Sequence, residues 1–164
     1  MLHPAALSID QLLAQCEVRR TRASGPGGQH RNKVETAVVV THRPTGIAAE
    51  GTERRSQAQN HAAAVLRLRL KLALAVRTEW REPSSLWQSR ARGGRISVSA
   101  QHDDFPALVA ESLDALAHGA WDAAATAQAL GVSTSQLVKL LKLEPAALAL
   151  LNGHRQSAGQ HPLR

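Results

Sequence analysis

The chain has 164 residues, a formal net charge of +7, one cysteine and a 2% share of aromatic residues. A single cysteine excludes an intramolecular disulfide and favours a reducing compartment. No run of about 18 uncharged apolar residues occurs, which excludes a membrane span, and the first residues lack a signal-peptide pattern. We therefore expect a cytoplasmic protein whose core is built from aliphatic side chains.

Charge is divided unevenly along the sequence. Residues 1–100 hold 16 Lys and Arg against 7 Asp and Glu, whereas residues 101–164 hold 4 against 6. Such an asymmetry predicts two modules with different partners, and we place their boundary at residue 100. Most of the cations are arginines, whose guanidinium groups pair with phosphate through two hydrogen bonds. The first module is therefore a candidate for contact with nucleic acid.

The first module begins with patterns typical of one short helix and three strands. Ser8 and Gln11 form a capping box for a helix over residues 8–16. Strands are predicted at residues 17–22, 36–41 and 47–50. The second strand is the clearest because it is β-branched and uncharged, and Pro44 and Gly46 mark the turn that follows it.

Residues 55–78 carry two conflicting patterns. Leucines at alternate positions mimic a strand, but the length and the Ala, Leu, Arg and Lys content favour a helix capped by Ser56. In a helix the leucines divide between two faces, with Leu66, Leu70 and Leu74 on one and Leu68 and Leu72 on the other. We therefore expect this helix to be covered on two sides.

The remaining residues predict mainly helices. Proline and glycine at residues 82–85 and 92–94 interrupt the long helix, and residues 95–99 predict a short strand or extended connector. Asp103 or Asp104 can then cap a helix that has Pro106 in its first turn. Further helices are predicted at residues 121–130, 133–143 and 145–153.

Two of these helices resemble a helix-turn-helix unit, because Gly131 separates residues 121–130 from a helix capped by Ser133. The net charge of −2 over residues 101–164 argues against strong phosphate binding. A small helical bundle that packs on the first module or binds a protein is the favoured interpretation. The whole pattern predicts an α+β fold: a small mixed or antiparallel sheet with a long packed helix and a protruding loop, followed by a small all-α module.

The loop between the first two predicted strands carries the candidate chemistry. Residues 24–30 are Ser-Gly-Pro-Gly-Gly-Gln-His, and such glycines let the main chain approach a crowded ligand. The loop lacks the ending of a P-loop and the strand-to-helix setting of a dinucleotide fingerprint. On the glycines alone, an ordinary hairpin turn stays open as an alternative. Basic residues around the loop are candidate RNA-binding residues: Arg19, Arg20, Arg22, Arg31 and Lys33.

The surroundings of this loop resemble a known family. Residues 22–46 are similar to the catalytic domain of class I peptide chain release factors and to the short factors that free peptides from stalled ribosomes. Four residues at the start of the long helix match as well: Arg55, Ser56, Gln57 and Asn60. The resemblance covers residues 17–76.

The resemblance implies ribosome-dependent hydrolysis of the ester that joins a nascent peptide to tRNA, with large-subunit RNA and peptidyl-tRNA as partners. Gly27 and Gly28 would allow the loop to approach the ester. The main-chain N–H of Gln29 would stabilise the developing charge, and its side chain would shape the water site. Gln29 is also the family's site of N-methylation, which implies a methyltransferase as a further partner. Arg54 and Arg55 are additional candidate RNA-binding residues.

Neither a metal nor a cofactor is expected. The chain has one cysteine, and its eight histidines lack the spacing of metal ligands. For His30 we favour a contact with RNA or packing within the loop over a role as general base, and for His42 a structural or surface role. We expect the protein to be a monomer.

Two features distinguish the sequence from the family pattern. Residues 1–16 precede the first predicted strand, where full release factors carry a domain that reads stop codons, so we expect codon-independent ribosome rescue. Residues 152–164 contain two arginines and no lysine, whereas short rescue factors end in a strongly basic tail. Two alternatives stay open: a ribosome- or RNA-binding factor without hydrolysis, and a helix-turn-helix regulator.

Overall fold

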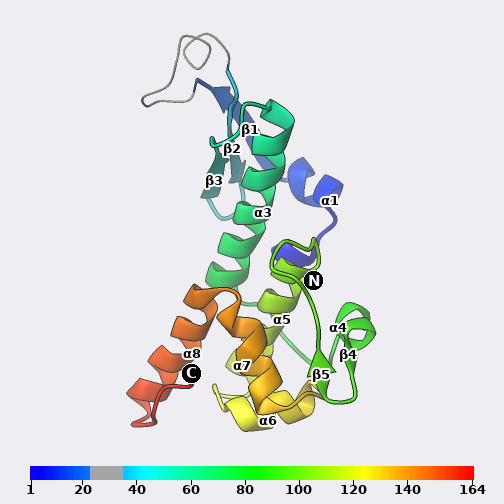
Figure 1. Cartoon of the computed structure of the whole chain (residues 1–164), viewed down its shortest axis with the longest axis vertical. Helices are drawn as coiled ribbons and strands as arrows, with labels where there is room; N and C mark the ends of the chain where they lie inside the picture. Colours follow the sequence, from blue (N-terminus) through cyan, green and yellow to red (C-terminus); the bar gives the residue numbers. More distant parts are fainter. Residues whose placement is uncertain (23–34) are drawn as a thin grey trace. The chain divides into compact units, whose positions relative to one another are not determined.

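A computed structural model describes residues 1–22 and 35–164 of the chain (Figure 1). The described residues form two compact units: a sheet unit, residues 7–72, and a helical unit, residues 1–6 together with 73–164. The division between the units falls inside the long helix α3, Gln57–Ala75. The module boundary that we placed at residue 100 stays a prediction.

The sheet unit opens with α1, Ile9–Ala14, whose capping box is confirmed. The Ser8 hydroxyl accepts the backbone N–H of Gln11, and the Gln11 side chain accepts the backbone N–H of Ser8. The prediction that the helix continues to Cys16 was wrong. Cys16 is the first residue of β1 and pairs with His42, so the inter-strand ladder replaces the last helical turn.

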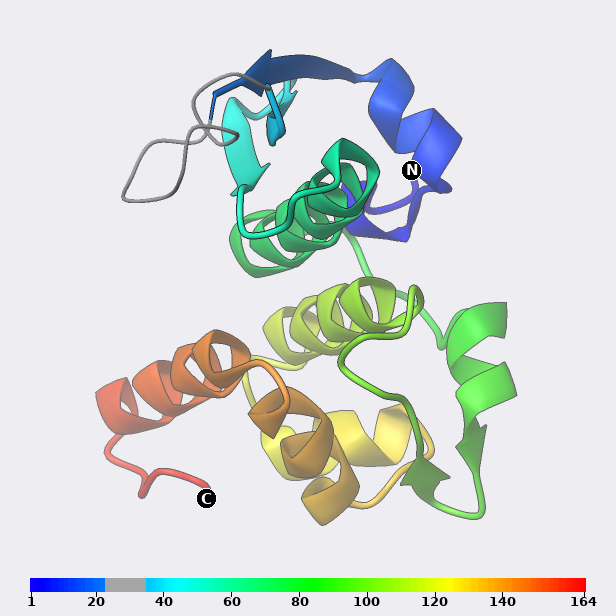
Figure 2. The ribbon, with the colours of Figure 1, turned by 45° about the horizontal axis from the view of Figure 1, so that its top comes forward.

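Three antiparallel strands follow in the order β1-β2-β3, and the α+β class is confirmed. Their bounds are Cys16–Thr21 for β1, Ala37–His42 for β2 and Ile47–Gly51 for β3. Gly46, at φ +72°, lies in the predicted turn between β2 and β3. Figure 2 shows α3 lying along one face of this sheet.

The core of the sheet unit lies between α3 and the sheet. Residues 57–75 are a helix, as propensity and length predicted, and the Ser56 hydroxyl accepts the backbone N–H of Gln59. Leu68 and Leu72 are fully buried, whereas Leu66 and Leu70 are half-buried. The other buried apolar residues of this unit include Leu12, Val38, Val40, Ala49, Ala64 and Val65.

The helical unit is assembled around α5, Phe105–His118, which is buried along most of its length. The other elements are η1 (Pro4–Ala6), α4 (Ser85–Arg90), β4 (Ala91–Arg92), β5 (Arg95–Ile96), α6 (Ala123–Ala129), α7 (Thr134–Lys142) and α8 (Pro145–Ser157). Trp87 is fully buried in this unit and its indole N–H donates to the carbonyl oxygen of Leu130 (2.8 Å). None of the helices in residues 1–22 and 35–164 combines the length and apolarity needed to cross a membrane.

Three predictions made from local sequence patterns were wrong in the helical unit. Helix α4 was not predicted; it begins at Ser85 and is capped by Ser84, whose hydroxyl accepts the backbone N–H of Trp87. Asp104 precedes α5 without capping it through its side chain, because its carboxylate pairs with Arg90. The last helix was predicted to end at Gly153 but continues to Ser157.

Residues 1–6 belong to the helical unit although the sheet unit follows them in the chain. The Nε2–H of His3 donates to the carbonyl oxygen of Val76 (3.0 Å), and the N–H of Ala5 donates to His3 Nδ1 (3.0 Å). The sheet unit is therefore inserted between Ala6 and Ala73, two residues of the same unit.

Gly51→Ala tests how closely α3 approaches the sheet. A Cβ at Gly51 would overlap the backbone carbonyl of Asn60, which cannot move without shifting α3. We expect the free energy of unfolding to fall by about 2 kcal/mol, as in other overpacked cores. Urea denaturation followed by circular dichroism measures this change.

Gly153→Ala is the matched control, because Gly153 lies in α8 and a Cβ built there has no atom within 4 Å apart from the neighbouring backbone of its own helix. Alanine is the better helix former by about 0.5–1 kcal/mol, so this variant should be at least as stable as the parent. Equal stability of the two variants would contradict the close approach at Gly51.

Candidate functional site

The glycine-rich loop connects two neighbouring strand ends, the end of β1 and the start of β2. Its predicted catalytic residues Gly27, Gly28 and Gln29, and the predicted RNA-binding residues Arg31 and Lys33, lie outside the described residues. The structure describes the chain on both sides of the loop. Because β1 ends at Thr21 and that residue pairs with Ala37 in β2, the segments leading into and out of the loop are neighbours.

The first turns of α3 hold the segment that follows the loop. The side-chain amide of Gln57 donates to the carbonyl oxygen of Glu35 (2.8 Å). The side-chain amide of Asn60 donates to the carbonyl oxygen of Thr36 (2.8 Å). Two successive carbonyl groups of the loop base are therefore fixed by two side chains that lie nearly one helical turn apart.

Asn60 also fixes the turn that leads into α3. Its side chain accepts the backbone N–H of Arg54 (2.9 Å) and donates to the carbonyl oxygen of the same residue (2.9 Å). Asn60 is completely buried, and an amide is the group that can supply both an acceptor and two donors there. The helix, the turn and the end of the loop consequently form one hydrogen-bonded junction.

Gln57 and Asn60 match the family pattern, but no role was predicted for them from the sequence. Both contact the backbone of the loop base, so they are positioning residues. A signal was present in the sequence, because two amide side chains spaced i, i+3 lie on one side of a helix start. Their acceptors are backbone carbonyls far away in the chain, which no local pattern specifies.

Five of the predicted RNA-binding arginines can be placed. Arg19 and Arg20 lie in β1 and Arg22 directly after it, while Arg54 and Arg55 lie in the turn before α3, and all five are exposed. Successive strand residues point to opposite faces, so Arg19 and Arg20 place positive charge on both sides of the sheet edge. The Asn60 junction brings the turn with Arg54 to the base of the loop.

One carboxylate close to these arginines, that of Glu53, forms an ion pair with another arginine. Glu53 pairs with Arg67 (2.5 Å), and this bond holds the pKa of the Glu53 carboxyl at about 2. A carboxylate held in this way adds little repulsion toward a phosphate. The base of the loop therefore presents arginines in excess.

His42 is a buried structural residue, one of the two roles that the sequence left open for it. It is 2% exposed, its Nε2–H donates to Gln15 Oε1 (3.0 Å), and the Thr45 hydroxyl lies 2.8 Å from Nδ1. Burial lowers the pKa of the His42 imidazole, because the charged form loses its hydration. Such a neutral, enclosed ring connects α1 to the end of β2 rather than serving a reaction.

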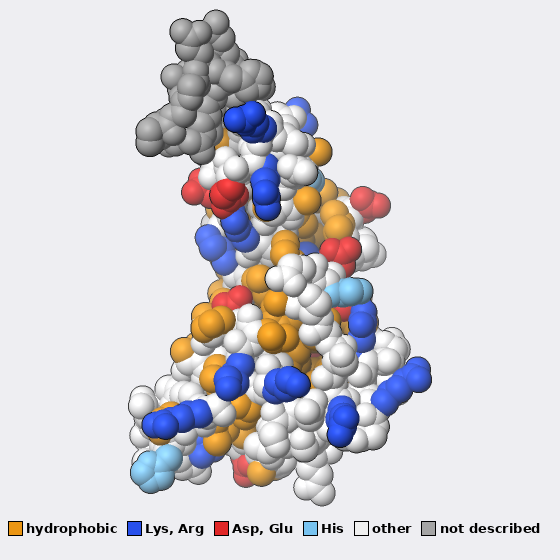
Figure 3. Space-filling view, viewed as in Figure 1, with side chains coloured by type: hydrophobic (Ala, Val, Ile, Leu, Met, Phe, Trp, Pro, Cys, Tyr) orange, Lys and Arg blue, Asp and Glu red, His pale blue; other side chains and the backbone are white. Residues whose placement is uncertain are grey.

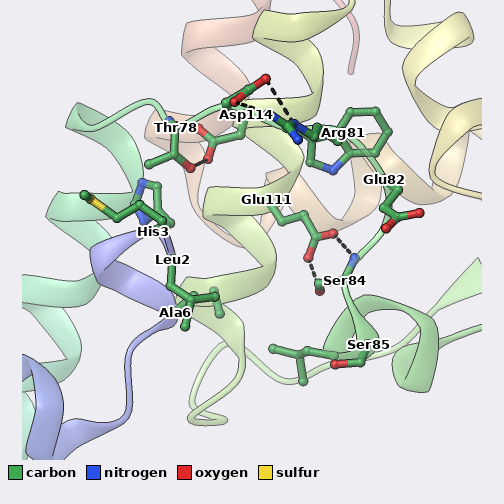
Figure 4. Close-up of a pocket in the computed structure, with 15 residues that line it drawn as sticks. Leu2, His3, Ala6, Thr78, Arg81, Glu82, Ser84, Ser85, Glu111 and Asp114 are labelled. Atoms are coloured by element: carbon green, nitrogen blue, oxygen red, sulfur yellow. Dashed lines mark hydrogen bonds and ion pairs between the residues drawn. The ribbon is translucent and has the colours of Figure 1, made fainter.

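A groove within the helical unit contains several carboxylates, and their bonds indicate a structural role (Figure 4). Asp114 accepts hydrogen bonds from the Thr78 hydroxyl (2.5 Å) and backbone N–H (3.1 Å), and pairs with Arg77. Glu111 accepts the backbone N–H (2.6 Å) and hydroxyl (2.5 Å) of Ser84. These contacts fix residues 76–85 against α5.

Comparison with known proteins identifies the family. The model of the RF-1 domain matches residues 7–103, which include all of the sheet unit and end just before α5. The chain therefore belongs to the RF-1 domain family, the class I release factor catalytic domain that the sequence resembles.

The curated relatives are much longer than this chain. It is 47% identical over 72 residues to a chloroplastic peptide chain release factor of Arabidopsis thaliana, which covers 44% of the chain and 16% of the relative. It is 42% identical over 107 residues to peptide chain release factor 1 of Nitrosomonas europaea, which covers 64% of the chain and 27% of the relative. Helices α6–α8 lie outside the residues matched by the domain model.

Asn60→Ala should destabilise the junction. The change leaves the carbonyl oxygens of Thr36 and Arg54 and the backbone N–H of Arg54 without this partner, which costs about 1–3 kcal/mol. Gln59→Ala, one residue away on the exposed side of α3, should change the unfolding free energy by less than about 0.5 kcal/mol. Chemical denaturation of both variants measures the difference, and equal losses would show that the Asn60 bonds contribute nothing.

The lowered pKa of His42 predicts a loss of stability in acid. In the unfolded chain the imidazole takes up a proton as the pH falls below about 6.5, while in the folded chain it stays neutral to a lower pH. The unfolded state then binds more protons, so stability is complete above this range and declines below it. The drop in unfolding free energy between pH 7.5 and pH 5.5 should be smaller in His42→Gln than in the parent.

Proposed function

We propose that this protein is a codon-independent peptidyl-tRNA hydrolase that acts on the ribosome in translation rescue. The observation that carries the proposal is the sequence Gly27-Gly28-Gln29, set between β1 and β2 of a chain that belongs to the RF-1 domain family. The junction at Asn60, which holds the base of that loop, supports a role in which the loop is positioned by the folded domain.

The chemistry is ester hydrolysis by an oriented water molecule. The water oxygen attacks the carbonyl carbon of the peptidyl ester, the bond to the tRNA ribose breaks, and the proton passes to the departing ribose oxygen. Glycines at 27 and 28 let the main chain enter a crowded site. The N–H of Gln29 donates to the developing oxyanion and its side chain limits where the water can lie. Ribosomal RNA supplies the remaining catalytic groups.

The arginines at the loop base fit a contact with RNA phosphates. Arg19, Arg20 and Arg22 lie along and after β1, and Arg54 and Arg55 belong to the turn held by Asn60. Phosphate contacts position a protein without reading sequence. We further propose that Arg31 and Lys33 contribute to the same contact, that the protein acts as a monomer in the cytoplasm, and that Gln29 is a target for an N-methyltransferase.

Gly28→Ala and Gln29→Ala should each abolish most peptide release. A ribosome with truncated messenger and labelled peptidyl-tRNA measures the rate directly. We expect at least a 100-fold loss for Gly28→Ala, the size seen when one oxyanion donor is misplaced, with ribosome binding unchanged. Gly153→Ala, a glycine in α8, is the matched control and should release peptide at the parent rate.

The same assay separates the alternatives. Release by the parent at equal rates on ribosomes with a stop codon, a sense codon or no codon supports codon independence, and dependence on a stop codon contradicts it. Binding without release would favour the second candidate, a ribosome-associated factor without hydrolytic activity.

A further inference from the structure

Helix α7 has one buried face and one exposed face. Leu137, Leu140 and Leu141 are buried in the helical unit. The opposite side presents Ser135, Lys139 and Lys142, which are spaced i, i+4 and i+7 and are all exposed. Gly131, at φ +70°, makes the turn from α6, and Ser133 caps α7 through the backbone N–H of Gln136 (3.2 Å). This is the helix-turn-helix arrangement that the sequence suggested.

A groove runs along the exposed face of α7. The backbone N–H and carbonyl oxygen of Leu163 bond to the side chain of Asn152 (2.7 and 2.9 Å), which brings the last residues beside α7. Lys139, Lys142 and Arg164 line the groove together with the hydroxyl residues of the first turn of α7, and three apolar residues complete the lining: Val138, Leu143 and Leu163. The groove therefore combines three cationic side chains with hydroxyl donors.

The short β4–β5 hairpin adds two further cations at the start of α7. The backbone N–H of Ser133 donates to the carbonyl oxygen of Gly94 (3.0 Å), and the backbone N–H of Ile96 donates to the Gln136 side chain (3.3 Å). These bonds hold the exposed residues Arg92 and Arg95 next to the first turn of α7. Figure 3 shows Lys and Arg side chains gathered over the part of the helical unit that contains α7 and β5, with few acidic side chains among them.

The net charge of −2 over residues 101–164 does not describe the local charge on the exposed face of α7. Asp114 is 4% exposed and pairs with Arg77, and Asp104 pairs with Arg90. Asp122 caps α6 through the backbone N–H of Ala125 (3.0 Å). These three carboxylates are thus engaged elsewhere, while Glu144 lies two residues beyond the end of α7. Helix α7 itself contains no acidic residue, and its two lysines form no ion pair with any residue of 1–22 or 35–164.

We propose that the exposed face of α7 docks on the phosphodiester backbone of RNA. The lysine ammonium groups and the Arg92 and Arg95 guanidinium groups match a row of phosphates, and the positive end of the α7 dipole adds to the attraction. Short side chains such as Ser135 reach phosphate oxygens but read few base edges, so the contact is independent of sequence. The choice of RNA over DNA rests on the proposed function.

A salt series on the full chain tests the proposal. A fluorescent 20-base-pair RNA duplex is titrated with the parent, with Lys139→Gln/Lys142→Gln and with Arg81→Glu. Both variants lower the net charge by the same amount, and the Arg81 side chain is 79% exposed in the loop between α3 and α4. We expect the double variant to bind about tenfold more weakly and the slope of log affinity against log salt to fall by about 1–2, while Arg81→Glu stays near the parent.

The outcomes that overturn the proposal are specific. An unchanged slope in the double variant, or an equal loss in Arg81→Glu, would show that α7 makes no phosphate contact of its own. Tighter α7-dependent binding to the matching DNA duplex, or to polyglutamate, would assign the face to another partner. Circular dichroism confirms that each variant is folded.

A photocrosslinking amino acid at position 135 tests the same face on ribosomes. We expect crosslinks to RNA from position 135 and none from position 156, an exposed residue of α8. Crosslinks from position 135 to ribosomal protein instead would overturn the proposal. The Gly28→Ala chain should crosslink like the parent. Absent peptide release with intact α7-dependent RNA binding refutes only the proposed function, and the reverse result refutes only this inference.

Discussion

The described part of the sheet unit depends on one buried side chain, the amide of Asn60. It joins the first turns of α3 to Thr36 at the base of the loop and to both backbone groups of Arg54 in the turn before the helix. Leaving a fully buried amide without partners costs more free energy than its hydrogen bonds contribute. The fold is therefore stable only with all three backbone groups bonded to Asn60. Gly51 makes the arrangement possible, because α3 approaches the sheet so closely that a Cβ there has no room.

This constraint explains how a glycine-rich loop can belong to a well-ordered fold. The loop connects neighbouring ends of β1 and β2, and the second of these ends is held twice, by Gln57 and by Asn60. The chain is therefore held on both sides of the loop, by strand pairing at Thr21 and by two side chains of α3 at residues 35 and 36.

The helical unit shows why total charge is a poor guide to a surface. Three of its acidic residues hold backbone N–H groups: Asp114 at Thr78, Glu111 at Ser84 and Asp122 at Ala125. Its lysines stay on the outer face of α7. Because exposed cations act on a polyanion over about 8–10 Å in physiological salt, the local arrangement decides the interaction.

The sequence by itself determined the local elements and the family. Capping by Ser8, the β-branched second strand, the choice of helix over strand at residues 57–75 and the Gly131 turn follow from interactions between near neighbours, which a linear pattern records. Tertiary structure decided three other features. Cys16 lies in a strand and not in a helix, and the Asp104 side chain pairs with Arg90 and does not cap α5. Residues 1–6 belong to the same unit as residues 73–164. In each case the deciding partner is distant in the chain, and the free energy gained by pairing with it exceeds the small preference that a local motif supplies.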